Sequence, residues 1–288
     1  MGSYTIFTDS GCDLAPALLK QWGVSCVDLT FHIDGSSRQY VNADIPPEEF
    51  YRRMRSGSVF KTAAVNPNAF RVAFEEALQR GEDVLYLGLS SGLSNTSTAG
   101  LTVARELQAD YPRQKLIAVD TRCASAGLGL LVCLAAKKCR QGVELEENAR
   151  FIRGLAPSIC HWFTVDDLTY LRRGGRVGAT AAFVGGMLDL RPVLHMDDAG
   201  RLVCMSRARG RSQSIRALAQ KYTELATDPA HGVYFISHGG CPEDAKELET
   251  AIRKAHGASA ALITDIGPVI GSHAGPGTLA LFFPGKKR

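Results

Sequence analysis

The sequence predicts an α/β protein with two domains, a largely parallel sheet in the first and a mixed sheet with a hairpin in the second. Three observations support this prediction. The chain has 288 residues, more than a typical single domain. Strand and helix patterns alternate through the first half, which is typical of a parallel sheet. In the second half, a hairpin turn at residues 197–200 interrupts that alternation.

The first half provides the elements of the parallel sheet. Its expected strands are apolar or alternating stretches that end at polar turns: residues 5–8, 24–33, 83–88 and 115–120. Its expected helices begin at capping residues, prolines or runs of small residues: after the turn at 9–14, at Pro46, at Asn66, within 90–96, at Ala124 and near Glu144. Segment 61–64, which carries Thr62, is expected to be a loop.

The second half provides the mixed sheet. Its expected strands are residues 158–165, 191–196, 201–205, 232–237, 260–265 and 278–283. Its expected helices are residues 177–190, 213–226 and 242–256. The boundary falls where the last helix of the first half ends near Gly154, which predicts domains at 1–155 and 156–288.

Composition excludes several classes of function. A net charge of +4, dispersed along the chain, does not indicate nucleic-acid binding. No apolar run is long enough for a bilayer-spanning helix, so no stable membrane insertion is expected. The opening residues lack the basic and apolar segments of a secretory signal, and a cytoplasmic location is therefore expected.

Cofactor motifs are missing from the sequence. The eight cysteines are scattered without a C-x-x-C pair, which supports neither a zinc site nor a disulfide framework. The phosphate-loop, dinucleotide-binding and H-E-x-x-H patterns do not occur. We therefore expect no metal and no nucleotide cofactor.

His273 is the only group that titrates near neutral pH in the glycine- and proline-rich stretch 267–283. The glycines and prolines predict a tight, turn-rich backbone up to a buried strand that begins at Thr278. A buried imidazole needs a hydrogen-bonding partner. One alternative is a core histidine bonded to a backbone carbonyl; the other is a ligand-binding histidine.

Arginines are concentrated in two places. Arg172, Arg173 and Arg176 surround two glycines in a compact cationic loop, which is also the composition of a solvated helix end. Further along, Arg207, Arg209 and Arg211 form an alternating run that we expect to be exposed. Such a run is either a solvated basic face or a docking surface.

Residues 88–92 satisfy G-x-S-x-G, the pattern around the nucleophile of α/β-hydrolases. With Ser90 as nucleophile and His273 as base, the protein would be a serine esterase. Two observations disfavour this alternative: the neighbouring residues are unusually rich in hydroxyl groups, and no HGGG-type oxyanion segment precedes the pattern.

An ordered set of motifs across nearly the whole chain resembles the DegV family. The motifs are YTIFTDSGCDL at 4–14, Lys61-Thr62, LSSGLSNT at 89–96, VDTRCASAGLG at 119–129, DLTYLRRGGR at 167–176 and GPVIGSHAGPGTLALFF at 267–283. The resemblance implies a DegV-like two-domain bacterial protein that binds a long-chain fatty acid. It also implies a carrier that is no enzyme by itself and presents the carboxyl group to a separate ATP-dependent fatty acid kinase subunit.

The resemblance also implies a site for the carboxylate. Thr62, Ser94 and His273 match the family residues that hold it, and two hydroxyls with an imidazole N–H are suitable donors for a carboxylate removed from water. Secondary contacts with the head group or with the partner are expected from Ser91, Arg173 and Arg176. In that setting the arginine run 207–211 is a candidate docking surface for the kinase.

The acyl tail needs an apolar channel, and composition points to the small, apolar segment 177–190 for it. We expect the tail to contact Ala182, Phe183, Val184 and Met187. Burying about ten methylenes is worth roughly 8 kcal/mol before the costs of association, at about 0.8 kcal/mol each. The tail would therefore provide most of the affinity, and the head-group site the orientation.

Overall fold

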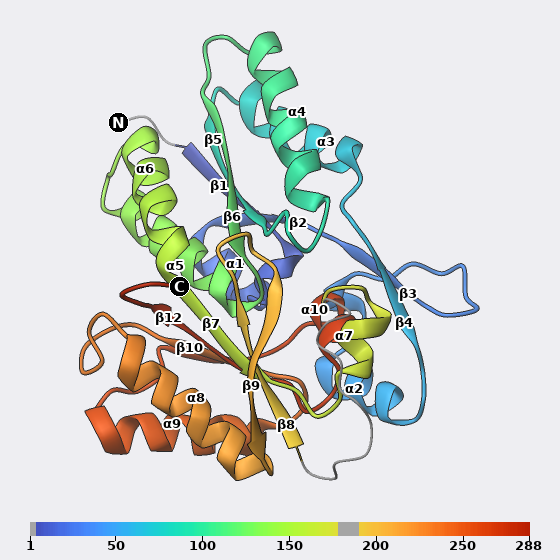
Figure 1. Cartoon of the computed structure of the whole chain (residues 1–288). Helices are drawn as coiled ribbons and strands as arrows, with labels where there is room; N and C mark the ends of the chain where they lie inside the picture. Colours follow the sequence, from blue (N-terminus) through green and yellow to red (C-terminus); the bar gives the residue numbers. More distant parts are fainter. Residues whose placement is uncertain (1–3, 178–189) are drawn as a thin grey trace.

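The computed structural model describes residues 4–177 and 190–288, which form two large sheets and a two-stranded ribbon, with helices around and between them (Figure 1). The first sheet is parallel throughout, in the order β2-β1-β5-β6. Its strands are β1 (Tyr4–Asp9), β2 (Val24–Val27), β5 (Asp83–Leu89) and β6 (Leu116–Cys123). The predicted parallel sheet of the first half is confirmed.

Helices cover both faces of the first sheet. In Figure 1, α3 (Pro67–Gln79) and α4 (Thr96–Asp110) lie on one side, and α5 (Ala126–Arg140) and α6 (Leu145–Leu155) on the other. A short helix, α1 (Pro16–Trp22), packs on α5 and β2. This two-sided cover explains why the strands are apolar on both faces, with Val84 to Leu89 all buried.

The second sheet is mixed, in the order β11-β10-β12-β7-β8-β9. Only β10 and β11 pair in parallel; the other neighbours are antiparallel, and the predicted hairpin at 197–200 joins β8 to β9. The strands are β7 (Ile159–Thr164), β8 (Leu190–Met196), β9 (Leu202–Arg209), β10 (Phe235–His238), β11 (Leu262–Asp265) and β12 (Leu279–Pro284). Helices α8 (Arg211–Leu225) and α9 (Pro242–His256) pack on this sheet.

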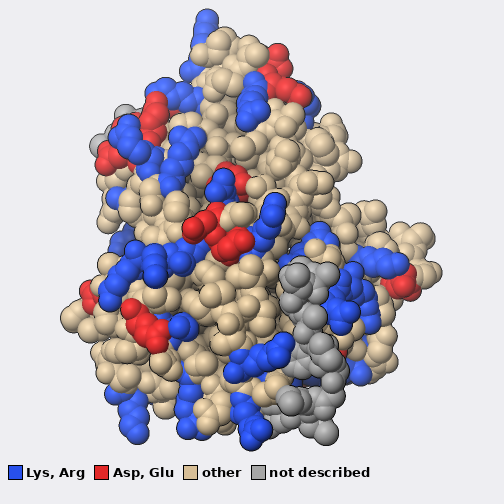
Figure 2. All heavy atoms as spheres, viewed as in Figure 1, with Lys and Arg blue, Asp and Glu red and all other residues tan. Residues whose placement is uncertain are grey.

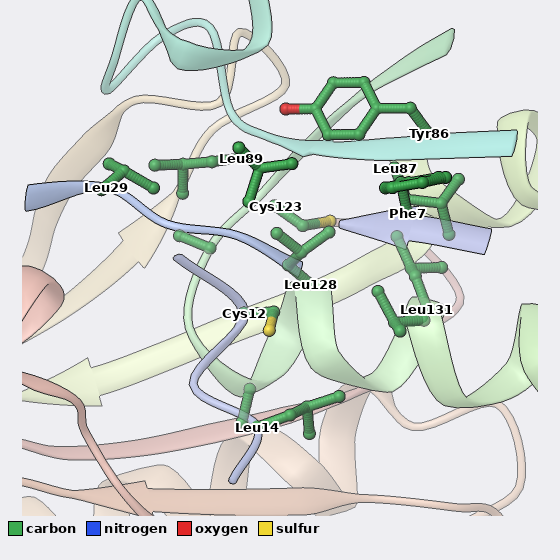
Figure 3. Close-up of a cluster of buried hydrophobic side chains, with 14 of the residues drawn as sticks. Phe7, Cys12, Leu14, Leu29, Tyr86, Leu87, Leu89, Cys123, Leu128 and Leu131 are labelled. Atoms are coloured by element: carbon green, nitrogen blue, oxygen red, sulfur yellow. The ribbon is translucent and has the colours of Figure 1, made fainter. Parts of the chain in front are cut away.

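Helix α5 lies between the two sheets, because it packs on β1 and β5 of the first sheet and on β7, β10 and β12 of the second. Figure 3 shows its Leu128 and Leu131 beneath Phe7 of β1 and Leu87 of β5. Its glycines permit close approach: a Cβ on Gly129 would lie 2.7 Å from the carbonyl oxygen of Cys12. The small-residue composition of this helix therefore brings the two sheets together.

Two sequence-based expectations about local structure are wrong. Residues 24–33 are two strands, because the chain leaves the first sheet after β2 and β3 (Thr30–Ile33) pairs with β4 (Phe60–Ala63) in a separate ribbon. Thr62 therefore lies in a strand. The ribbon is held by buried aromatic rings, with Phe31 packed against Phe50 and Phe60.

The stretch expected to be turn-rich before Thr278 contains a short helix, α10 (Pro268–Ala274). Its first residue is proline, which suits the first helical turn. Its Gly271 packs against the rings of Phe50 and Tyr51 in α2 (Pro47–Arg55), where a Cβ would approach the Tyr51 hydroxyl to 2.6 Å. The glycines there serve close packing of a helix, and Gly275 and Gly277, with positive φ, end it.

The expected boundary near residue 155 stays a prediction, and contacts cross it. For example, the Tyr51 hydroxyl donates a 2.8 Å hydrogen bond to the carbonyl of Ile266. Within the described parts of the chain, no helix is long and apolar enough to cross a bilayer. Figure 2 shows Lys and Arg spread over one face among acidic and uncharged residues.

Candidate functional site: a cavity with one polar end

A cavity of about 300 Å³ lies between the two sheets. It is bounded by the ends of β4, β5 and α10, by the start of α5, and by one face of β7, β8 and β12. Its volume is at the lower limit of small-molecule pockets, about 300–1,000 Å³. The carboxyl ends of parallel strands are the usual location for ligands in α/β proteins.

Three residues expected to bind a carboxylate line this one cavity: Thr62 in β4, Ser94 in the loop before α4, and His273 in α10. The sequence places them far apart, and the fold brings them together because α10 packs on β4. The Thr62 Oγ1 and His273 Nε2 atoms are 2.8 Å apart. His273 is therefore bonded to a hydroxyl group, and the alternative of a bond to a backbone carbonyl is not what the structure has.

The surroundings of His273 favour its neutral form. Burial, assisted by the positive charge of Arg176, lowers its pKa to about 4. Its Nδ1 is buried and has no hydrogen-bond partner among the described residues. Gly174 packs so closely against it that a Cβ there would lie 2.2 Å from Nδ1. An N–H at Nδ1 would have no acceptor, so the proton belongs on Nε2.

This tautomer fixes the direction of the hydrogen bond. His273 Nε2–H donates to Thr62 Oγ1, which leaves the Thr62 hydroxyl proton free to point elsewhere. Thr62 lines the cavity. The pair thus places a hydroxyl donor at the cavity's polar end, with the imidazole behind it.

Ser94 is the second hydroxyl at this end. Its Oγ accepts the backbone N–H of Thr96 at 3.2 Å and lies 3.0 Å from the Thr96 hydroxyl. This short turn precedes α4 and directs the Ser94 side chain into the cavity.

Of the expected secondary residues, only Arg176 lines the cavity. Its Nε donates to the carbonyl of Leu93 at 3.0 Å and its Nη1 to that of Gly174 at 2.5 Å. It therefore ties the Ser94 loop to the glycine that packs on His273. Arg173 is exposed, with its guanidinium 5.9 Å from the Tyr170 ring, and Ser91 is exposed, with Oγ donating to Asp120 at 2.5 Å.

The opposite wall of the cavity is apolar. Phe163 of β7 lies beside its register partner Ala280 of β12, Met196 comes from β8, and Leu202 opens β9. Sequence reasoning did not single out these residues, although alternation along 158–165 and 278–283 was the available signal. The residues expected to contact an acyl tail, Ala182, Phe183, Val184 and Met187, lie outside the described residues.

His161 also lines the apolar wall, opposite Phe282 in the strand register. Its Nδ1 donates to the carbonyl of Ile159 at 2.9 Å, and its Nε2 accepts the N–H of Ala124 at 3.2 Å. Burial lowers its pKa to about 3. Both nitrogens are satisfied by the backbone, so this neutral histidine is a structural part of the wall.

Ser125 forms a second polar feature of the cavity that sequence reasoning missed. Its hydroxyl donates to Asp13 at 2.5 Å, and Asp13 accepts the N–H of Gly267 at 2.9 Å. Burial raises the pKa of Asp13 to about 8. Ser125 and Asp13 both have positive φ, an uncommon conformation outside glycine. Asp13 links the turn after β1 to the segment that begins α10.

The hydrolase alternative has no support in the structure. The Ser90 side chain is fully buried and donates a 2.8 Å hydrogen bond to the carbonyl of Gly200, at the tip of the β8–β9 hairpin. It also accepts the N–H of Gly92 at 3.1 Å. His273 is bonded to Thr62. Ser90 therefore connects the end of the first sheet to the β8–β9 hairpin through a hydrogen bond.

The arginine run is only partly exposed. Arg207 and Arg209 lie on the exposed side of β9, whereas Arg211 starts α8 and pairs with Asp244 at 2.8 Å and with Asp166 at 3.6 Å. The expectation of an exposed run is therefore wrong for Arg211, because two acidic residues from other elements cover it. Within the described residues, no cluster of His, Cys, Asp and Glu suits a metal ion.

Comparison with known proteins gives consistent matches along the chain. The family model for "Uncharacterised protein, DegV family" matches residues 3–286. A DegV domain-containing protein of Clostridium perfringens is 38% identical over 286 residues, covering 99% of this chain and 98% of the relative.

Solved structures share the fold. A Thermus thermophilus structure described as "Fatty Acid Binding of a DegV family Protein" is 29% identical with a TM-score of 0.88, covering 98% of this chain and 99% of that one. A Thermotoga maritima structure, described as revealing "fatty acid binding function", is 25% identical with a TM-score of 0.83 and covers 99% and 100%. The predicted α/β fold is therefore confirmed.

Proposed function

This chain belongs to the DegV family, and from that premise we propose that it binds a long-chain fatty acid in the cavity between its sheets. Thr62 and Ser94 donate their hydroxyls to the carboxylate, and His273 holds Thr62 in place from behind. The tail runs along the apolar wall and the segment that contains Ala182, Phe183, Val184 and Met187. The protein is a carrier in the bacterial cytoplasm, without catalytic activity of its own.

One observation carries this proposal: the hydrogen-bonded pair of Thr62 and His273 lies at one end of a cavity whose opposite wall is apolar. A carboxylate taken from water loses several kcal/mol unless donors replace its hydration. Two hydroxyls meet that need, while the His273 imidazole holds the Thr62 hydroxyl in place. The Thermus and Thermotoga structures, both described as binding fatty acids, agree with this ligand class.

The carrier presents its bound carboxylate to a separate ATP-dependent fatty acid kinase. What supports this step is the position of the polar end. Asn95, which is exposed, lines both the cavity and a second, open groove between α3 and α4. The head group is then near the surface while the tail is inside. Arg173, Ser91, Arg207 and Arg209 are exposed contacts for that partner, and Arg176 screens the bound charge.

Native mass spectrometry of the purified protein tests the ligand class. A non-covalent adduct with the mass of a fatty acid is expected, and delipidated protein should take up palmitate or oleate. Protein that carries no lipid and binds neither acid contradicts the proposal. A fluorophosphonate probe provides the control against the esterase, because buried Ser90 should remain unlabelled.

A further inference from the structure

Thr96 connects the two hydroxyl groups of the polar end, although it does not line the cavity itself. It is the first residue of α4, and its side chain is fully buried. Its Oγ1 accepts the backbone N–H of Val65 at 3.2 Å and lies 3.0 Å from Ser94 Oγ. Val65 follows Thr62 by a few residues, in the segment that leaves β4. A single hydroxyl therefore ties together the segments that carry Thr62 and Ser94.

The proton positions follow from which groups can accept. Thr96 Oγ1 already accepts a hydrogen bond from Val65, and among the described residues Ser94 Oγ is the acceptor within reach of its own proton. If Ser94 donated to Thr96 instead, the buried Thr96 proton would have no acceptor, which is costly. Thr96 therefore donates to Ser94, and the Ser94 proton points away from Thr96.

We propose that Thr96 is a positioning residue for carboxylate binding: by donating to Ser94 and accepting from Val65, it holds the Ser94 hydroxyl proton toward the cavity and sets its place relative to Thr62. This inference rests on the proposed function. The polar end then consists of two similar hydrogen-bonded pairs. His273 donates to Thr62 and Thr96 donates to Ser94, and each acceptor presents its own hydroxyl proton to the cavity.

A purely structural role for Thr96 makes a different prediction. A residue that only stabilised the start of α4 would affect every ligand of the cavity equally. A residue that orients a donor affects each ligand in proportion to the strength of the hydrogen bond that the donor makes with it. Hydrogen bonds to a carboxylate are roughly twice as strong as neutral ones. Comparing palmitate with 1-hexadecanol, which has the same tail without the charge, separates the two roles.

The experiment measures the Kd of palmitate and of 1-hexadecanol for delipidated wild-type protein and for three variants. Thr96→Val removes the hydroxyl at nearly constant shape, Thr96→Ser keeps it, and Thr98→Val changes an exposed threonine two residues along α4. We expect Thr96→Val to raise the Kd of palmitate about tenfold and that of the alcohol about threefold, since half the free energy is lost. Thr96→Ser and Thr98→Val should remain within about twofold of wild type for both ligands.

Equal weakening of both ligands by Thr96→Val, or no weakening of palmitate, overturns the inference while the proposed function stands. Wild-type protein that binds no palmitate overturns the proposed function and this inference with it. If Thr96→Val does not fold, Thr96→Cys replaces it, because a thiol is a weak donor of similar size. It should give the same acid-selective loss, and wild-type affinity for palmitate in a folded Thr96→Cys variant counts against the inference.

Discussion

The polar end of the cavity and its apolar wall each contain a neutral histidine, and the two differ in what their nitrogens bind. His161 in the wall is bonded at both nitrogens to backbone groups of Ile159 and Ala124. His273 at the polar end is bonded to a side-chain hydroxyl that itself lines the cavity. A histidine satisfied by the backbone supports the fold, whereas one that orients a hydroxyl supports a ligand. Substitutions in the two regions should therefore act on stability and on binding, respectively.

The largest expected effect is on stability, at Gly127 behind the apolar wall. A Cβ there would lie 2.3 Å from His161 Nε2 and 2.8 Å from the Phe282 ring. Gly127→Val should lower the free energy of unfolding by about 3 kcal/mol through overpacking. Gly154→Ala in α6 is the matched control, because a Cβ there meets nothing within 4 Å; it should stabilise by about 0.5–1 kcal/mol. Urea denaturation measures both.

The largest loss of palmitate affinity is expected from substitutions at the polar end. Thr62→Val removes the donor but keeps the shape of the side chain, and we expect the Kd of palmitate to rise about ten- to a hundredfold. The unfolding free energy should fall by about 1 kcal/mol, because His273 Nε2–H loses its acceptor. His273→Gln should weaken binding less, because the amide can still donate to Thr62. Isothermal titration calorimetry measures the affinities. Wild-type affinity in Thr62→Val would show that the carboxylate binds elsewhere.

Both neutral histidines contribute to the pH dependence of stability, because burial lowers the pKa of His161 to about 3 as well. A substitution at His273 therefore isolates the contribution of the polar end. The pKa of His273 is lowered from its ordinary 6.5 to about 4 in the folded protein. Between these values the unfolded chain binds more protons, so the stability that the neutral imidazole contributes is present above about pH 6.5 and is lost as the pH falls toward 4. His273→Gln should make this loss smaller by about 2 kcal/mol after allowance for solvent screening. Denaturation curves at pH 7, 5.5 and 4.5 measure the unfolding free energy of the wild type and of His273→Gln. If that free energy fell equally with pH in both proteins, the assigned burial of His273 would be contradicted.

The smallest expected effect on ligand binding is at Arg173. Its side chain is exposed and lies outside the cavity wall. Arg173→Ala should change the Kd of palmitate by less than about twofold. If it is a partner contact, the fatty acid bound to the same variant should be phosphorylated more slowly by the kinase. A large loss of palmitate affinity would instead assign Arg173 to the head-group site.

Local patterns predicted much of the fold. The parallel sheet, the hairpin and most helices follow from periodicity and turn residues, which act over a few residues. The ribbon of β3 and β4 did not follow, because its pairing depends on a distant strand and on aromatic packing around Phe31. Similarly, α10 was not predicted, because its glycines are typical of turns. In the structure Gly271 permits contact with Phe50 and Tyr51, which lie more than 200 residues away in the sequence.

The candidate site was also predicted only in part from the sequence. Residue types and motif resemblance predicted that Thr62, Ser94 and His273 act together, and the fold brings them to one cavity. The apolar wall was not identified, because core and cavity residues have the same strand pattern. Ser90 was ambiguous because its motif specifies a tight turn, and the hairpin that it binds at Gly200 lies more than 100 residues away.

A crystal structure of the palmitate complex tests the central claim most directly. The account predicts that one carboxylate oxygen lies about 2.5–3.0 Å from Thr62 Oγ1 and the other at a similar distance from Ser94 Oγ. The tail should extend between α10 and the face of β7 and β12. A carboxylate bound away from these hydroxyls, with the tail pointing toward Thr62 and His273, would contradict it.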